Sequence, residues 1–237
     1  MRPVVIFTHI PKVAGTSLVR KLVLPNYPRD LIKSYKGELD LLRSRGRYQV
    51  LVGHSVYGIQ HLVTGPVKMF TMLRDPIERA ISHYYFIKQP GEFGPGRNLE
   101  QKRTNREVQL AEIFEYNKHR KFRLAGTWLI DNMQTRYLAG YSHYWKSESS
   151  LSLLSAAKFN LEKRYVEFGL LDQFEESSLR IASSLGWVLA ERVDKTKETR
   201  IQKIVTSEDR AAVEKWNLLD QDLHSFAQEL FRKRGLR

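Results

Sequence analysis

A lysine, a glycine and two hydroxyl residues stand directly after a β-branched run at residues 4–8. A helix that begins at Gly15 would leave the N–H groups of Gly15, Thr16 and Ser17 without intrahelical partners and with partial positive charge. These groups can bind an anion, to which the Lys12 ammonium adds a full charge, and glycine lets the backbone come close to it. The pattern predicts a strand, a phosphate-binding turn and a helix. The alternative is an ordinary strand–turn–helix corner with a surface lysine.

The order of the residues in this turn bears on the kind of phosphate that it binds. Loops for nucleoside triphosphates end in Gly-Lys-Ser/Thr, where the lysine reaches the outer phosphates and the hydroxyl binds magnesium. In this chain Lys12 comes before Gly15. A P-loop kinase that uses ATP and magnesium is therefore a competing hypothesis and not the leading one.

A second polar motif follows the β-rich run at residues 67–73. Asp75 followed by Pro76 is typical of a helix start, with the carboxylate as the N-cap and the proline at the first helical position. The Arg74 guanidinium supplies a planar fork of donors for phosphate oxygens, and the Ser82 hydroxyl on the following helix can complete the shell. For Arg79, an i,i+4 pair with Asp75 is favoured over direct contact with a ligand.

Together the two motifs resemble those of sulfotransferases that use 3′-phosphoadenosine-5′-phosphosulfate (PAPS). The motif His-Ile-Pro-Lys-x-x-Gly-Thr-Ser at 9–17 is similar to the 5′-phosphosulfate loop of the branch that contains heparan sulfate 2-O-sulfotransferase and its bacterial relatives. Arg-Asp-Pro-x-x-Arg-x-x-Ser at 74–82 is similar to the family's 3′-phosphate site. The resemblance implies a P-loop NTPase-like, three-layer α/β fold with a central parallel sheet flanked by helices. It also implies a set of PAPS-binding residues: Lys12, Ala14, Gly15, Thr16, Ser17, Arg74 and Ser82.

Sulfuryl transfer needs a base for the acceptor hydroxyl and stabilisation of the leaving phosphate, and it needs no metal. His54 is the expected base, because it follows the β-rich run at 48–52 and an imidazole titrates near neutrality. The family also places a histidine in a Gly-His segment, although its 2-O enzyme has His-Gly-His where this chain has Val52. His9 and His83 are the rival candidates. Lys12 is expected to neutralise charge on the leaving oxygen, with adenosine 3′,5′-bisphosphate (PAP) as the other product.

A third segment, at residues 131–140, resembles the family motif Asn-x-Gln-Thr-Arg-Phe/Tyr-Leu on the acceptor side. It implies that Asn132, Gln134 and Arg136 contact the acceptor, although a polar helix face explains the pattern nearly as well. A carbohydrate hydroxyl is the leading acceptor, followed by a lipid or small-molecule alcohol.

The charge of the chain fits anionic ligands. Its 39 lysine and arginine residues against 26 aspartate and glutamate residues leave +13, which attracts an acidic nucleotide cosubstrate or an anionic glycan. Nucleic acid is not expected, because the basic residues are dispersed and no zinc-finger, RNA-binding or basic-zipper pattern occurs. A non-enzymatic protein that binds anions or nucleic acid is the other alternative; it would explain the charge but not the histidine. The absence of cysteine fits a reducing compartment, and no segment has the length and apolarity to span a bilayer, so a soluble protein of a bacterial cytoplasm is expected.

A single domain over residues 1–237 must position these groups. Strands are expected at 4–8, 48–52, 67–73 and 165–169. The ligands of parallel sheets bind beyond the carboxyl ends of strands, so Lys12, His54 and Arg74 are expected to meet at one crevice. Helices are expected at 16–24, 31–42, 76–87, 107–117, 126–138, 151–164, 175–185 and 208–234. The segment Gln89–Asn98 is a candidate lid, and Lys197 or Arg200 is a candidate to close over the nucleotide.

Overall fold

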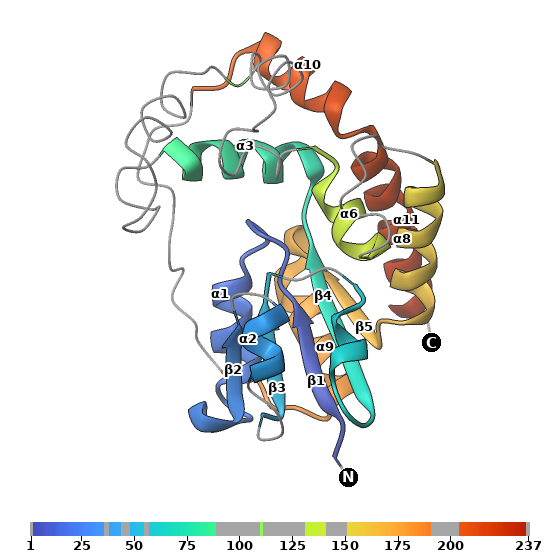
Figure 1. Cartoon of the computed structure of the whole chain (residues 1–237). Helices are drawn as coiled ribbons and strands as arrows, with labels where there is room; N and C mark the ends of the chain where they lie inside the picture. Colours follow the sequence, from blue (N-terminus) through green and yellow to red (C-terminus); the bar gives the residue numbers. More distant parts are fainter. Residues whose placement is uncertain are drawn as a thin grey trace.

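Five parallel strands form one sheet at the centre of the protein (Figure 1). The computed structural model describes residues 2–35, 38–43, 48–54, 57–88, 110, 131–140, 151–190 and 204–235. The sheet has the order β2-β3-β1-β4-β5. The strands are β1 Val4–Thr8, β2 Ile32–Tyr35, β3 Val50–Gly53, β4 Val67–Leu73 and β5 Glu167–Leu170. The fold class expected from the sequence, an α/β fold with a central parallel sheet flanked by helices, is confirmed.

The register of the sheet brings three strand ends together. Thr8 at the end of β1 pairs with Gly53 at the end of β3 on one side and with Thr71 of β4 on the other. All three strands run in the same direction, so the segments that follow them leave from one edge of the sheet. The structure therefore agrees with the predicted meeting of the chain after β1, β3 and β4 at this edge.

Helices cover both faces of the sheet (Figure 1). The face that carries Phe7 and Phe70, whose rings stack at 4.8 Å, packs against α1 Gly15–Leu18, the π-helical turn η1 Val19–Val23 and α9 Phe174–Leu185. The opposite face packs against α6 Met133–Ala139, α8 Leu151–Lys163 and α11 Leu218–Gly235. The remaining helices and turns are η2 Arg29–Leu31, α2 Glu38–Arg43, η3 Ile59–Leu62, α3 Pro76–Lys88, η5 Leu171–Gln173 and α10 Ser207–Trp216.

Two segments differ from the sequence-based expectation. Residues 31–42 were expected to be one helix, but β2 occupies Ile32–Tyr35 and pairs with β3 in four-residue register. A strand this short is stabilised by its neighbour and not by its own pattern, so tertiary pairing overrides the local spacing. The helix expected at 208–234 is two helices, because Asn217 interrupts it and caps the junction between α10 and α11.

Helix α3 begins as predicted. The Asp75 carboxylate accepts a hydrogen bond from the Glu78 backbone N–H at 2.8 Å, so it caps the helix that starts at Pro76. The favoured pair between Arg79 and Asp75 is wrong. Arg79 is fully buried and its Nη1 donates to the Met133 sulfur at 3.1 Å, so it joins α3 to α6.

Several expectations lie outside the described residues. These are the candidate lid at 89–98, the helix at 107–117, residues 126–130 of the next helix, and Lys197 and Arg200. Within the described ranges, no helix has both the length and the hydropathy to cross a bilayer.

Candidate active site

The turn after β1 has an unusual backbone. Lys12 and Ala14 both adopt left-handed conformations, with φ of 73° and 59°, on either side of the fully buried Val13. A non-glycine residue in this region costs of order 1 kcal/mol, and such strain gathers at functional sites. Val13 anchors the turn in the core, and the two strained residues reverse the chain so that it enters α1. The strain thus sets the shape of the predicted phosphate loop.

The start of α1 is packed against His9. A Cβ atom placed on Gly15 would lie 1.9 Å from His9 Nε2, so only glycine fits here. The first backbone bond of the helix runs from the Leu18 N–H to the Ala14 carbonyl at 3.0 Å. The N–H groups of Gly15, Thr16 and Ser17 come before that bond, at the open end of the helix. The predicted anion-binding groups are therefore where the sequence placed them.

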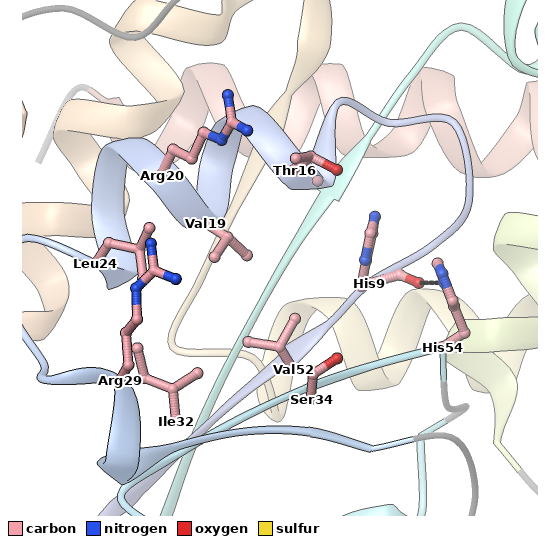
Figure 2. Close-up of a pocket in the computed structure, with 11 residues that line it drawn as sticks. His9, Thr16, Val19, Arg20, Leu24, Arg29, Ile32, Ser34, Val52 and His54 are labelled. Carbon is pink, nitrogen blue, oxygen red and sulfur yellow. Dashed lines mark hydrogen bonds between the residues drawn. The ribbon is translucent and has the colours of Figure 1, made fainter. Parts of the chain in front are cut away.

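His54 follows Gly53 at the end of β3 and lies beside His9 (Figure 2). Its Nδ1 is 2.7 Å from the His9 carbonyl oxygen, and the two imidazole rings lie 4.4 Å apart. A carbonyl oxygen only accepts, so Nδ1 carries the proton and the neutral ring has its lone pair on Nε2. The hydrogen bond therefore fixes the tautomer that can accept a proton at Nε2.

Desolvation lowers the pKa of both imidazoles and so favours their neutral forms. Desolvation, with a smaller contribution from His54, lowers the pKa of His9 to about 3. His54 itself reaches the solvent, but the protein packed around its ring lowers its pKa below the usual 6.5, and its bond to the His9 carbonyl opposes this only in part. A neutral, oriented imidazole at the edge of a sheet is suited to act as a general base.

Arg74 follows β4 and contacts the turn after β1. Its Nη1 donates to the Lys12 carbonyl oxygen at 3.1 Å. Burial lowers the pKa of the Arg74 guanidinium, and Glu78 and Asp75 oppose that shift, so the group remains a cation. The structure therefore brings Arg74 and Lys12 together.

Helix α3 packs beside the turn that carries Lys12. The Lys12 ammonium lies 4.3 Å from the centre of the Phe86 ring on this helix. Ser82 is one helical turn before Phe86 and is 5% exposed, so it lies on the same face of α3. The rival His83 is buried on this helix at 3% exposed. Of the two positions that the resemblance assigns to the 3′-phosphate, Arg74 thus bonds the Lys12 carbonyl, and Ser82 lies on the face of α3 whose Phe86 ring contacts the Lys12 ammonium.

Gln134 has a different place from the one expected. Its side-chain amide accepts a hydrogen bond from the Arg74 N–H at 3.0 Å and donates to the Arg74 carbonyl at 2.9 Å, so both backbone groups of Arg74 are held by one side chain. Gln134 is 1% exposed. This pair of bonds acts as a clamp on the residue that follows β4.

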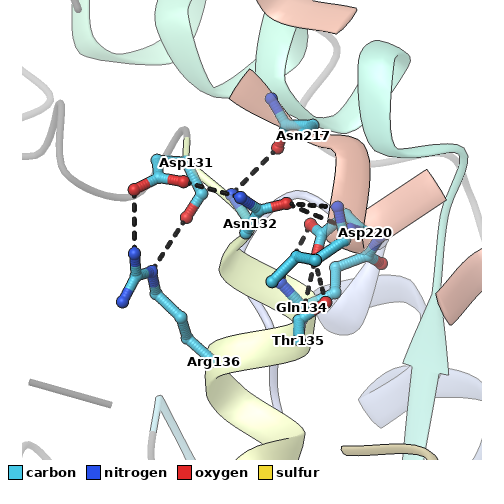
Figure 3. Close-up of polar contacts among 8 residues, drawn as sticks. Asp131, Asn132, Gln134, Thr135, Arg136, Asn217 and Asp220 are labelled. Carbon is cyan, nitrogen blue, oxygen red and sulfur yellow. Dashed lines mark hydrogen bonds and ion pairs between the residues drawn. The ribbon is translucent and has the colours of Figure 1, made fainter. Parts of the chain in front are cut away.

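Asn132 and Arg136 are also buried in a polar network around the start of α6 (Figure 3). Asn132 Oδ1 accepts from the backbone N–H groups of Leu219 and Asp220, and Arg136 Nη2 pairs with Asp131 at 2.9 Å. The two residues and Gln134 are 4% exposed or less, and the contacts that the structure shows for them are with the protein itself; their contacts with an acceptor stay a prediction. Their hydrogen bonds hold α6, α11 and the end of β4 together.

Asp220 is the residue of this network that the sequence did not reveal. Its carboxylate accepts from the Gln134 N–H, the Thr135 N–H and the Thr135 hydroxyl, at 2.7 to 3.1 Å (Figure 3). Burial raises its pKa, and the Arg79 guanidinium and these donors oppose that rise. An acidic residue on a long polar helix carries no local sign that it will be buried, so no pattern could have identified it.

Comparison with known proteins gives the family. The model of the sulfotransferase family matches residues 2–233, almost the whole chain. This chain belongs to the sulfotransferase family. The resemblance read from residues 9–17 and 74–82 is therefore confirmed.

One curated relative is heparan sulfate 2-O-sulfotransferase 1 of Gallus gallus, which is 25% identical over 174 residues. The match covers 68% of this chain and 46% of the relative, so the chain spans about half the length of the protein that it matches.

Two solved structures show a loose likeness. A sulfotransferase of Alicyclobacillus acidocaldarius has a TM-score of 0.45 and 16% identity, over 96% of this chain and 99% of that one. The mouse sulfotransferase SULT7A1, solved with PAP, has a TM-score of 0.40 and 12% identity, over 83% of this chain and 62% of that one.

The buried His9 imidazole predicts a pH dependence of stability. The unfolded chain binds a proton at His9 near pH 6.5 and the folded protein only near pH 3, so stability is fully present above pH 6.5 and decreases as the pH falls from there. We expect His9→Phe to reduce the loss of unfolding free energy between pH 7.5 and pH 5 by about 1 to 2 kcal/mol. Urea unfolding at both pH values measures this. The exposed His61 provides the control His61→Phe, and an equal loss in wild type and His9→Phe would contradict the expectation.

The buried Asp220 carboxylate predicts a stability contribution. Asp220→Ala leaves three donors at the start of α6 without their acceptor, and we expect it to lower the free energy of unfolding by about 2 to 4 kcal/mol. Asp222→Ala, at an exposed position of the same helix, should change it by less than about 0.5 kcal/mol. Equal effects of the two substitutions in urea unfolding would show that the network contributes little.

Proposed function

We propose that this chain is an enzyme that transfers a sulfuryl group from PAPS to an acceptor hydroxyl, with PAP as the other product. The observation that carries the proposal is the hydrogen bond between the Arg74 guanidinium and the Lys12 carbonyl, 3.1 Å long. This bond joins the two segments that resemble the 5′- and 3′-phosphate sites of the family. The match of the family model over residues 2–233 and the PAP bound in the solved mouse sulfotransferase give further support.

The residues at this edge of the sheet fit a doubly phosphorylated nucleotide. The 5′-phosphate would be held by Lys12, Ala14, Gly15, Thr16 and Ser17, because the turn offers backbone N–H groups, two hydroxyls and an ammonium. The 3′-phosphate would be held by Arg74 and Ser82, which offer a planar cation and a hydroxyl. Among the described residues, no cluster of acidic side chains or histidines could hold a metal ion, and no part of the proposal needs one.

PAPS supplies the sulfuryl group, whose bond to the 5′-phosphate oxygen breaks as the acceptor oxygen bonds to sulfur. His54 accepts the proton of the acceptor hydroxyl at Nε2, since Nδ1 is held by the His9 carbonyl. Lys12 places a positive charge at the loop where negative charge gathers on the leaving phosphate. His9 is the lesser candidate for the base, because its ring packs against Gly15.

For the acceptor we propose a hydroxyl of a carbohydrate. Support comes from the heparan sulfate enzyme of Gallus gallus and from the net charge of +13, which favours an anionic glycan. A lipid or another small-molecule alcohol is the alternative acceptor within the same reaction.

Calorimetric titration with PAP and with ATP–Mg²⁺ tests the donor. We expect PAP to bind to the wild-type chain more tightly than ATP–Mg²⁺. Lys12→Ala and Arg74→Ala should each weaken PAP about tenfold or more, since each removes a charged partner of a phosphate. Tighter binding of ATP–Mg²⁺ would favour a kinase, and duplex DNA binding that both variants retain, with no PAP binding, would favour a non-enzymatic protein.

The role of His54 predicts a separation of binding from turnover. His54→Ala should leave PAP affinity within about twofold of wild type and lower kcat by about 100-fold or more, the usual contribution of a general base. Because the pKa of His54 is lowered, kcat/KM of the wild type should be constant above pH 6.5 and decrease only at more acidic pH. Release of PAP with a range of hydroxyl acceptors measures both. Turnover of His54→Ala at the wild-type rate would assign the base to another group.

The clamp on Arg74 predicts that a buried amide supports nucleotide binding. Gln134→Leu keeps the volume but leaves the Arg74 N–H and carbonyl without partners, so we expect PAP affinity to fall about tenfold. Thr135→Val is the matched control. Thr135 lies on the same helix as Gln134, and the substitution removes its hydroxyl bond to Asp220 of α11 but leaves the clamp intact. Both variants should lose stability, but only Gln134→Leu should lose affinity. Equal PAP affinity in the two variants would assign Gln134 a purely structural role.

A further inference from the structure

A second cationic site lies on the other side of His54 from Arg74. A pocket of about 440 Å³ opens between the helical segment α1–η1 and the sheet, over β2 and β3 (Figure 2). Its volume is in the range typical of small-molecule sites. Eleven residues line it: His9, Gly15, Thr16, Val19, Arg20, Leu24, Arg29, Ile32, Ser34, Val52 and His54.

The sheet register explains how these residues come together. Phe7 pairs with Val52, and Val52 pairs with Ser34, so side chains at these positions project from one face of the sheet. Helix segment η1 passes over the same face and contributes Val19 and Arg20. The pocket is thus lined by residues of β2, β3 and the helical segment α1–η1, and it ends at the histidine that we propose as the base.

The pocket has an apolar middle and a cationic end. Figure 2 shows Val19, Val52 and Ser34 between the two imidazoles on one side and the side chains of Arg20 and Arg29 on the other. None of the lining residues is acidic. Both guanidinium groups are exposed. Within the described part of the chain, neither makes a side-chain hydrogen bond or ion pair, so both are available to a ligand.

We propose that this pocket binds the acceptor, and that Arg20 and Arg29 select acceptors that carry an anionic group, a carboxylate or a sulfate ester, next to an apolar ring face. The inference rests on the proposed function, which places the nucleotide over Lys12 and Arg74 and leaves the side of His54 toward β3 and β2 for the acceptor. An acid whose anion lies at the guanidinium groups and whose apolar face covers Val19 and Val52 can present its hydroxyl to His54 Nε2.

The charge pattern carries the argument. Two arginines that share a pocket repel each other, and a carboxylate or sulfate relieves that repulsion and accepts the planar fork of donors of a guanidinium. With a neutral acceptor, the two exposed guanidinium groups would be solvated by water alone and would contribute nothing to acceptor binding. The apolar middle favours the faces of a pyranose or an aromatic ring, so a uronate sugar and a hydroxyaryl acid share the required chemistry.

Matched acceptor pairs test the proposal and separate these two sources. The pairs are 4-nitrophenyl glucuronide with 4-nitrophenyl glucoside, and 4-hydroxyphenylacetate with 2-(4-hydroxyphenyl)ethanol. We expect kcat/KM in PAP release to be about tenfold or more higher for the acid of at least one pair, and the pair with the larger difference identifies the source. Equal rates within both pairs would overturn the proposal.

Variants then place the selectivity in the pocket. Arg20→Met and Arg29→Met keep much of the side-chain volume and should each remove most of the preference for the acid, chiefly through KM, while calorimetric affinity for PAP stays within about twofold of wild type. Arg232→Met, at an exposed position of α11, is the control and should change neither quantity. If either pocket variant weakens PAP as much as Lys12→Ala does, that arginine belongs to the nucleotide site and the proposal fails. If wild-type protein binds no PAP, the proposed function fails first, which keeps the two failures distinct.

Discussion

The parallel register of β3, β1 and β4 is the constraint on which the candidate site depends. Because Thr8 pairs with both Gly53 and Thr71, the turn after β1 must pass between the segment that carries His54 and the segment that carries Arg74. No flexible arm is needed to assemble these groups. The hydrogen bond from Arg74 to the Lys12 carbonyl then joins the turn to β4, and the bond from His54 to the His9 carbonyl joins it to β3.

The site is held in an arrangement that the local chain would not adopt alone. Left-handed conformations at Lys12 and Ala14 and the desolvated imidazole of His9 all disfavour it. The surrounding fold opposes this cost with buried contacts, since Val13 is fully buried under the turn and the Gln134 amide satisfies both backbone groups of Arg74. A fixed loop and a fixed arginine lose little conformational freedom on binding, which favours a preorganised anion site.

The sequence predicted the parts of the molecule whose signal is local. Four of the five strands, the Asp75 cap and the order of residues in the first turn follow from patterns within a few positions, and the structure agrees with them. Strand β2 was missed because its stability comes from β3. The place of Gln134 was missed for a related reason: its two bonds join residues 60 positions apart, and a polar residue on a short helix looks the same whether it faces a ligand or a backbone. The family motif implied acceptor contacts for this segment, and the contacts that the structure shows for Gln134 are with the backbone of Arg74 and with Asp220.

The basic side chains of the candidate site form two groups on opposite sides of His54. In the proposed reaction the sulfuryl group passes from an anionic donor to an anionic acceptor, which repel each other, so we expect each anion to have its own positive charge and the base between them to be neutral. Lys12 and Arg74 lie toward β4, Arg20 and Arg29 line the pocket over β3 and β2, and His54 lies between the two sides with a pKa lowered by the surrounding protein. Were His54 protonated, it would add a fifth cation to these four and could accept no proton. The protein packed around the solvent-facing His54 ring lowers its pKa, and we infer that this keeps the proposed base neutral between the two proposed anionic ligands of a strongly basic protein.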